Sequence, residues 1–227
     1  MFKVKDLKHP FTWENRQPFV CDRIFYVPDY YSSYEEFSFP GWKDKEIFAR
    51  QLPVCVEYCS GNGDWIVSKA LENKNFNWVA VEKRFDRVRK IWAKIKNYTL
   101  DNLFIVCGDA LTFTKSYVSS CSIQKVYINF PDPWPKDRHA KHRIIQSEFI
   151  HELVRVMVLG GNLMMVTDDR EYSMRMIDEV KLNPSLSYAY PYPYYVNNLM
   201  NYGSSWFNEL WQKKGRDIRY IKCYREA

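Results

Sequence analysis

Acidic side chains stand at or just beyond the ends of four apolar runs in the central part of the sequence. Glu57 lies in the first run, Glu82 ends the second, Asp109 ends the third and Asp132 follows the fourth. In an open sheet of parallel strands, ligands bind outside the carboxyl ends of the strands. If these runs are strands of one sheet, the four carboxylates share one edge and are candidate ligand-binding or catalytic groups.

The glycines in "EYCSGNG" (57–63) suit a turn that a ligand can approach closely. Glu82 follows Gly61 by 21 residues, the offset at which an acid reaches the ribose hydroxyls of a nucleotide. A glycine turn that begins an ordinary helix is the alternative. Beyond Gly63, the third glycine of the dinucleotide pattern is replaced by Ile66, and Glu57 would repel phosphates. Both features favour a ligand with an ammonium and a sulfonium, such as S-adenosylmethionine.

Three prolines in "FPDPWP" (130–135) interrupt the fourth apolar run. Each proline lacks an amide for a strand ladder and disfavours the helical conformation in the residue before it. We therefore expect the strand to stop near Asn129, with Phe130, Asp132 and Trp134 in extended or polyproline conformation. The loop would hold Asp132 in place at little entropic cost when a ligand binds. A rigid connector whose tryptophan merely packs is the alternative.

Basic residues follow this loop and also fill a second stretch. Residues 136–143 hold four basic residues against one acid, and residues 83–96 hold seven against one. Such clusters indicate a polyanion partner, and solvated helix faces are the alternative. The candidate phosphate contacts in the first cluster are Lys136, Arg138, Lys141 and Arg143.

Strand-like and helix-like segments alternate from residue 52 onward, as in a doubly wound α/β sheet with right-handed crossovers. We expect a helix at 83–96. We expect a second helix with an apolar stripe from Ile145 to Met157, ending at Gly160 and Gly161. The segment 204–215 predicts a late helix that begins at a serine N-cap. The predicted strands are 53–59, 77–82, 103–109, 125–130 and 162–168, with 185–192 and 218–225 as two further candidates.

Composition sets outer limits on the class of protein. The 227 residues carry 33 basic and 27 acidic side chains, a formal charge of +6, and six cysteines without a C-x-x-C pair. We expect reduced, packing cysteines, no metal site, no membrane span and a cytoplasmic location. The predicted organisation is an irregular aromatic and basic N-terminal extension at 1–50 and one domain at 51–227.

The motif "NFPDPWPKDRHAKHR" (129–143), with the glycine turn, Glu82, Asp109 and "VTDD" (166–169), resembles the bacterial tRNA (guanine-N(7)-)-methyltransferases. The likeness extends from about residue 53 to the C-terminus, and the proline loop is its specific part. It implies an S-adenosylmethionine-dependent methyltransferase of class I, with a mostly parallel, seven-stranded Rossmann-like sheet. It also implies that the product is 7-methylguanosine in the variable loop of tRNA. We expect the protein to be a monomer or a homodimer.

The resemblance also assigns roles to residues. Asp132 is expected to be catalytic and to lie against the cofactor. At Cys59 the family usually has glycine, and the family's threonine and glutamate correspond to Ser205 and Asn208. The other cofactor contacts that it implies are Glu57, Glu82 and Asp109, and the substrate contacts are Lys136, Asp168, Ser205 and Asn208. Gly61 and Gly63 are candidate cofactor contacts from the glycine turn, and Trp134 and Arg138 are candidate substrate contacts from the proline loop and its basic tail.

The chemistry expected at Asp132 follows from the target atom. Nitrogen-7 of guanine has an in-plane lone pair and no proton, so its methylation needs no general base. Asp132 would act by position and charge, because the purine becomes cationic as the methyl group arrives. Trp134 would stack on the target guanine after that base has flipped out of the stacked bases of the tRNA, or would pack in the loop. Asp168 would accept hydrogen bonds from the guanine edge, or would cap the next helix.

Two other functions stay open from the sequence. Exocyclic-amine methyltransferases use an acid or asparagine, two prolines and an aromatic residue, but here one proline separates Asp132 from Trp134. A catalytically silent RNA-binding subunit on the same fold is the second, and the acids at all four cofactor positions argue against it. Mapping the methylated atom and measuring S-adenosylmethionine binding separate these functions.

Overall fold

The structure is a computed structural model that describes residues 1–10, 16–28, 37–204 and 206–226. By its internal contacts the chain divides into two compact units, Met1–Ser119 and Ser120–Ala227. The expected boundary near residue 50 stays a prediction. All six cysteines are free; Cys55 and Cys223 are buried, whereas Cys21 and Cys121 are exposed, so a packing role does not extend to all six. In the parts of the chain that the structure describes, no helix has the length and apolar character needed to cross a bilayer.

The first unit is built around strands buried on both faces. Its strand order is β1-β2-β5-β4-β3, parallel except for the antiparallel pair β1 and β2. Every residue of β3 and β4 is buried, as expected for parallel strands covered on both sides. The strands are β1 (Phe19–Cys21), β2 (Ile24–Tyr26), β3 (Val54–Tyr58), β4 (Asn77–Glu82) and β5 (Leu103–Cys107).

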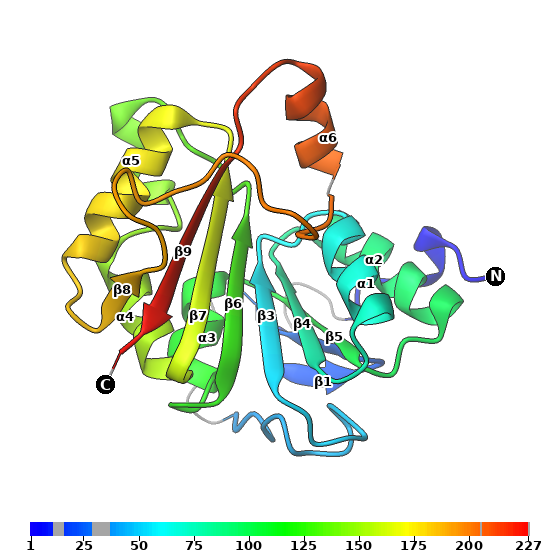
Figure 1. Ribbon diagram of the computed structural model, residues 1–227. Helices are drawn as coiled ribbons and strands as arrows, with labels where there is room; N and C mark the ends of the chain where they lie inside the picture. Colours follow the sequence, from blue (N-terminus) through cyan, green and yellow to red (C-terminus); the bar gives the residue numbers. More distant parts are fainter. Residues whose placement is uncertain (11–15, 29–36, 205, 227) are drawn as a thin grey trace. The chain divides into compact units, whose positions relative to one another are not determined.

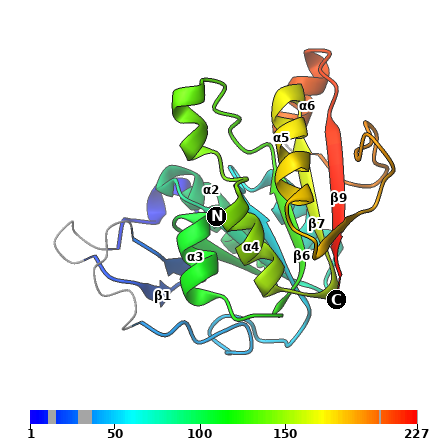
Figure 2. The ribbon, with the colours of Figure 1, turned by 90° about the vertical axis from the view of Figure 1, so that its left-hand side faces the viewer.

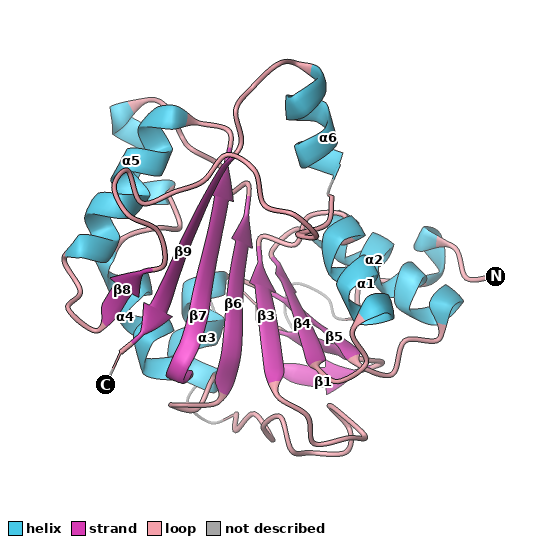
Figure 3. Cartoon of the chain, viewed as in Figure 1, coloured by secondary structure: helices cyan, strands magenta, loops and turns pink. Residues whose placement is uncertain are grey.

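Helices of the first unit follow the strands as the sequence pattern predicts. The apolar stripe Val88, Ile91, Trp92 and Ile95 is buried in α2, and α1 and α2 pack against β4 (Figures 1 and 3). The helices are η1 (Val4–Asp6), α1 (Asp64–Glu72), α2 (Phe85–Tyr98) and α3 (Ala110–Tyr117).

The N-terminal segment differs from the expected irregular extension. It supplies the hairpin β1–β2, and β2 extends the parallel sheet beside β5. Phe25 of β2 is fully buried and packs edge-on against Tyr117 of α3 at 5.0 Å between ring centroids. Phe39 stacks on Phe25 at 5.0 Å. Phe25 and Phe39 of the N-terminal segment therefore form part of a core with α3.

The second unit contains four strands in the order β6-β7-β9-β8 (Figure 1). Strands β6 and β7 are parallel, and β9 is antiparallel to both of its neighbours. Helices α4 and α5 contact each other on one face of these strands (Figure 2). The elements are β6 (Ile123–Asn129), η3 (Asp137–His142), α4 (Ser147–Val156), β7 (Met157–Thr167), α5 (Arg170–Lys181), β8 (Leu186–Tyr188), α6 (Trp206–Lys213) and β9 (Arg219–Arg225).

The seven predicted strands are confirmed as β3 to β9, but the end predicted for the α4 helix is wrong. The helix ends at Val156, and Gly160 and Gly161 lie inside β7. A Cβ on Gly161 would lie 2.8 Å from the Val158 carbonyl oxygen and 3.0 Å from that of Gln124. Gly161 therefore allows a close backbone approach next to a shift of register between β6 and β7, a common use of glycine within a strand, while Gly160 has a positive φ of +72°.

Candidate functional site

The glycine turn between β3 and α1 is a tight backbone structure. Ser60 donates its amide to the Val81 carbonyl at 3.1 Å, and Gly63 donates to the Ser60 carbonyl at 2.9 Å. Gly61 and Gly63 both have positive φ, +56° and +77°. A Cβ on Gly63 would lie 2.7 Å from the Ile91 side chain in α2. Gly63 is thus required both by its backbone conformation and by the packing of α2 against the turn.

Glu82 is the residue that ties this turn to the end of β4. It is 5% exposed, and its two carboxylate oxygens accept from the amides of Gly61 at 2.8 Å and Arg84 at 2.9 Å. Arg87 lies 3.8 Å from the same carboxylate. Burial raises the pKa of Glu82, while the two amides and Arg87 lower it and so offset part of the cost of the buried charge. The turn and Glu82 therefore form one preorganised unit.

Glu57 and Asp109 stand at the ends of the two neighbouring strands. Glu57 is the second-last residue of β3 and is 2% exposed. Asp109 is half-buried and is the N-cap of α3, where its Oδ1 accepts from the Thr112 amide at 3.0 Å. The structure thus gives Asp109 a capping role that the sequence prediction did not include. The carboxylates of all three acids can accept from the ammonium and hydroxyl groups of S-adenosylmethionine, and their charge suits its sulfonium.

Cys59 adopts the left-handed backbone conformation, with φ of +61°. This conformation favours glycine, the residue the resembling family usually has here. Burial, together with the carboxylates of Glu82 and Glu57, raises the pKa of the Cys59 thiol to about 12. Cys59 therefore stays a neutral thiol at pH 7 and adds no negative charge to the turn.

A substitution series at Cys59 tests the backbone assignment. We expect Cys59→Gly to keep the free energy of unfolding within about 1 kcal/mol of wild type or above it, because the left-handed strain is removed. Cys59→Val should lower it by about 1–3 kcal/mol, since a β-branched residue tolerates positive φ poorly. Urea unfolding measures both. The control is Cys55→Val in β3, and equal losses at the two positions would contradict the assignment.

The basic helix α2 is largely engaged within its own unit. Lys94 donates to the Asn62 carbonyl at 2.8 Å and also pairs with Asp64, so it supports the glycine turn. Lys90 donates to the Asn62 side chain at 3.1 Å, and Lys96 pairs with Asp22. These contacts favour a structural role for much of this basic cluster over the predicted phosphate contacts.

The proline loop begins where the sequence predicted, since β6 ends at Asn129. The Asn129 side chain accepts a 2.6 Å hydrogen bond from the Tyr202 hydroxyl. The predicted extended conformation is wrong for Phe130 and Trp134, which have φ of +49° and +42°. Both residues have local support: the Phe130 amide donates to the Val166 carbonyl at 2.8 Å, and the Trp134 amide donates to Asp132 at 3.2 Å.

Asp132 is exposed, and Trp134 is half-buried. The Asp132 Oδ1 atom accepts the Trp134 amide, an Asx-type turn that fixes the carboxylate relative to the loop. The Trp134 ring contacts His139 and His142 of η3, at 5.6 and 5.3 Å between ring centroids. Of the two roles left open by the sequence, the structure thus provides packing contacts for Trp134.

The basic residues after the loop have different environments. Lys136 and Arg138 are exposed, which suits contact with a partner, and Arg138 donates to His139 at 3.1 Å. Arg143 is buried instead, and its guanidinium donates to backbone carbonyls of the proline loop. The predicted phosphate contact by Arg143 is therefore disfavoured. No local sequence signal distinguishes it from Lys136.

Two adjacent acids after β7 have separate roles. Asp169 is the N-cap of α5 and accepts from the Tyr172 amide at 2.7 Å. The alternative in which Asp168 caps the helix is therefore wrong. Asp168 is half-buried and pairs with Arg216, while Arg219 donates to its backbone carbonyl at 3.3 Å. A guanine edge would have to share the Asp168 carboxylate with Arg216.

The last predicted substrate contacts lie in or beside α6. Asn208 is 4% exposed and donates to the Tyr220 hydroxyl at 3.0 Å. A direct contact of Asn208 with substrate is disfavoured by this burial, because the asparagine is packed toward β9. Ser205 lies outside the described residues.

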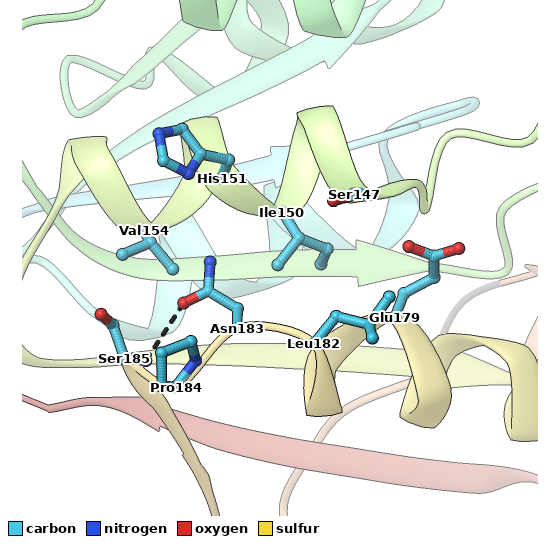
Figure 4. A pocket seen from close by; sticks show the side chains of 9 residues that line it. All are labelled: Ser147, Ile150, His151, Val154, Glu179, Leu182, Asn183, Pro184 and Ser185. Atoms are coloured by element: carbon cyan, nitrogen blue, oxygen red, sulfur yellow. Dashed lines mark hydrogen bonds between the residues drawn. The ribbon is translucent and has the colours of Figure 1, made fainter.

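A pocket of about 310 Å³ lies between α4 and α5 and contains none of the predicted site residues (Figure 4). Among the described residues, no group of three or more His, Cys, Asp and Glu is arranged to hold a metal ion. The absence of a metal in the reaction stays a prediction. The pocket is lined by Ser147, Ile150, His151, Val154, Glu179, Leu182, Asn183, Pro184 and Ser185.

Comparison with known proteins gives close relatives over nearly the whole chain. A family model described as "Putative methyltransferase" matches residues 51–221. A tRNA (guanine-N(7)-)-methyltransferase of Chlamydia trachomatis is 52% identical over 218 residues, 95% of each chain. Its counterpart in Chlamydia muridarum is 54% identical over 216 residues, again 95% of each chain. One from Lachnoclostridium phytofermentans is 30% identical and covers 80% of this chain and 85% of the relative.

Solved structures share the fold at low identity. TrmN from Thermus thermophilus aligns with a TM-score of 0.55 and 11% identity, over 78% of this chain and 45% of that one. Phosphoethanolamine N-methyltransferase 2 from Haemonchus contortus, solved in complex with S-adenosyl-L-methionine, aligns with a TM-score of 0.53 and 9% identity, over 78% and 50%. The expected fold class, a mostly parallel α/β sheet of the class I S-adenosylmethionine-dependent methyltransferase type, is confirmed.

Proposed function

Because the chain belongs to the tRNA (guanine-N(7)-)-methyltransferase family, we propose that it methylates nitrogen-7 of a guanine in tRNA, giving 7-methylguanosine. The observation that carries the proposal is the 52% identity to a tRNA (guanine-N(7)-)-methyltransferase over 95% of the chain. The finer proposals are that the guanine lies in the variable loop, that the protein acts in the cytoplasm and that it is a monomer or homodimer.

The residues proposed to hold S-adenosylmethionine are those of the first unit. Glu57, Glu82 and Asp109 supply the acceptors, and the turn at Gly61 and Gly63 lets the ligand approach the backbone. S-adenosylmethionine, when bound, supplies the methyl group on a sulfonium. The buried carboxylates support this proposal, because Glu57 and Glu82 are 2% and 5% exposed and can balance positive charge away from bulk water.

Asp132 is the proposed catalytic residue. Its carboxylate is exposed on a loop that its own side chain helps to fix, through the bond from the Trp134 amide. A base seated against it would develop positive charge on the purine during methyl transfer, and a preorganised carboxylate stabilises that charge without having to reorganise. Guanine N7 has no proton to lose, so Asp132 does not need to act as a base.

The proposed tRNA contacts lie in the second unit. Lys136 and Arg138 would hold phosphates, since both are exposed and follow directly after the loop. Asp168 is kept as a contact to the guanine edge, and its pairing with Arg216 means that this arginine would also lie near the base. Substrate contacts by Ser205 and Asn208 are proposals that rest on the family resemblance, and stacking by Trp134 is a proposal that rests on its place in the loop beside Asp132.

Identification of the methylated nucleoside tests the proposed function. The full-length protein, S-adenosylmethionine and unmodified tRNA transcript are incubated together, and the RNA is digested and analysed by mass spectrometry. We expect 7-methylguanosine at one position, in the variable loop. A methyl group on an exocyclic amine would favour the amine methyltransferase, and S-adenosylmethionine binding without any methyl transfer would contradict the proposal. Lack of S-adenosylmethionine binding in calorimetry would favour a silent RNA-binding subunit.

A further inference from the structure

Arg143 is an unusual member of the basic cluster after the proline loop, because it is only 9% exposed. Arginine is almost never buried unless its charge and donors are paired. Its Nε donates to the Pro133 carbonyl and its Nη2 to the Trp134 carbonyl, each at 2.8 Å. Both distances are those of good hydrogen bonds from a charged donor.

These two carbonyls lie on either side of Trp134, in the segment that carries Asp132. Prolines cannot donate to a neighbouring strand, so the loop cannot be held by an ordinary ladder. Trp134 also has φ of +42°, a conformation that persists only where the surroundings impose it. Arg143 donates to the two carbonyls, while Asp132 accepts from the Trp134 amide at 3.2 Å. The conformation of the loop and the position of the Asp132 carboxylate are thus coupled.

The backbone around Arg143 is itself anchored. The Arg143 amide donates to the Ala140 carbonyl at 3.1 Å, and the Gln146 side chain donates to the Arg143 carbonyl at 2.7 Å. Gln146 also donates to the Lys141 carbonyl at 3.0 Å. The guanidinium of Arg143 is attached to an anchored backbone, and its N–H donors lie in one plane. It is therefore suited to donate to two adjacent acceptors.

We propose that Arg143 is a positioning residue for methyl transfer: it holds the loop that aims Asp132 and does not bind a tRNA phosphate. The inference rests on the proposed function of Asp132. It separates Arg143 from Lys136, Arg138 and Lys141, which are exposed and available to the RNA backbone. Arg143 should therefore affect the rate of the chemical step, whereas the exposed residues should affect the affinity for tRNA.

Arg143→Lys is the informative substitution, because it keeps the charge but replaces the planar fork by a single ammonium. We expect kcat to fall about tenfold, less than the roughly hundredfold loss for a 1 Å misplacement of a reacting group. The KM for tRNA and the dependence of tRNA affinity on salt should stay as in wild type. The matched control, Lys141→Met, should instead raise KM and reduce the slope of log K against log salt by roughly 0.7 to 0.9.

A double-mutant cycle with Asp132→Ala tests whether Arg143 acts through Asp132. If it does, adding Arg143→Lys to Asp132→Ala should cause little further loss of kcat. Independent, multiplied losses would overturn the inference, as would an Arg143→Lys protein with normal kcat. A reduced salt slope for Arg143→Gln would make Arg143 a phosphate contact.

The cycle also separates this inference from the proposed function. If wild-type protein makes no 7-methylguanosine, the proposed function has failed; if Asp132→Ala is fully active, the role of Asp132 has failed. Urea unfolding checks that each variant is folded. Should Arg143→Lys not fold, Arg143→Gln replaces it in the cycle, because it can still donate to one of the two carbonyls.

Discussion

Replacing Asp132 by alanine is expected to lower the rate of methyl transfer about a hundredfold to a thousandfold, the usual cost of losing one preorganised electrostatic group. The carboxylate lies exposed on the loop, where it can face the positive charge that develops on the purine. Affinity for S-adenosylmethionine should be largely retained, because Glu57 and Glu82 remain in place. Single-turnover methyl transfer and calorimetry with S-adenosylmethionine measure the two effects.

Asp132→Asn is the matched control for the loop structure. Asparagine keeps a side-chain oxygen that can accept the Trp134 amide, as Asp132 does at 3.2 Å, but it has no charge. If the charge of Asp132 stabilises the transition state, the asparagine variant should lose most of the rate while its loop stays intact. Near-normal turnover of the alanine variant would refute the catalytic role, and an active asparagine variant would assign the effect to loop geometry.

Replacing Glu82 by alanine is expected to weaken S-adenosylmethionine binding about tenfold to hundredfold. The carboxylate accepts the Gly61 and Arg84 amides at 2.8 and 2.9 Å, and a hydrogen bond to a charged group contributes about 1.5–3 kcal/mol. Without it the turn loses the group that fixes Gly61. Each carboxylate oxygen has a further lone pair, so Glu82 can hold the turn and still accept from a ribose hydroxyl.

Calorimetry on the full-length protein measures this loss, with tRNA affinity as the internal control. The S-adenosylmethionine affinity of Glu82→Gln should lie between those of wild type and Glu82→Ala, because the single oxygen of the glutamine side chain can replace only one of the two carboxylate acceptors. Unchanged S-adenosylmethionine affinity in Glu82→Ala would show that the turn needs no carboxylate. A parallel loss of tRNA affinity would indicate a wider structural defect instead of a cofactor-specific one.

The order of the strands after residue 52, and the helices α2, α4 and α6, could be predicted from the sequence because they depend on local patterns. The apolar run 77–82 has the bounds of β4, and the prolines after Asn129 end β6 where they must. Strand β2 could not be predicted in this way. It has only three residues, and its place beside β5 depends on pairing with residues about 80 positions away.

The candidate site likewise has features that local sequence predicted and features that only the fold determines. Residue types at strand ends and the motif at 129–143 were sufficient to place the acids and to indicate the family. Sequence did not show that both oxygens of Glu82 hold backbone amides, or that Asp109 caps α3. These roles depend on which donors lie within about 3 Å of each carboxylate in the folded chain. The residues next to it in the sequence give little information about those donors.

By itself, the sequence determined the fold class, the strand that ends at the proline loop, and the acids that stand at the strand ends, because stereochemistry and periodicity act over a few residues. Only the tertiary structure decided among residues of the same charge. Of two adjacent acids, Asp169 caps a helix and Asp168 pairs with Arg216. Of two basic residues after the loop, Arg143 donates to the loop backbone and Lys136 is exposed. Like charges differ in role because burial and hydrogen-bond partners are set by the fold.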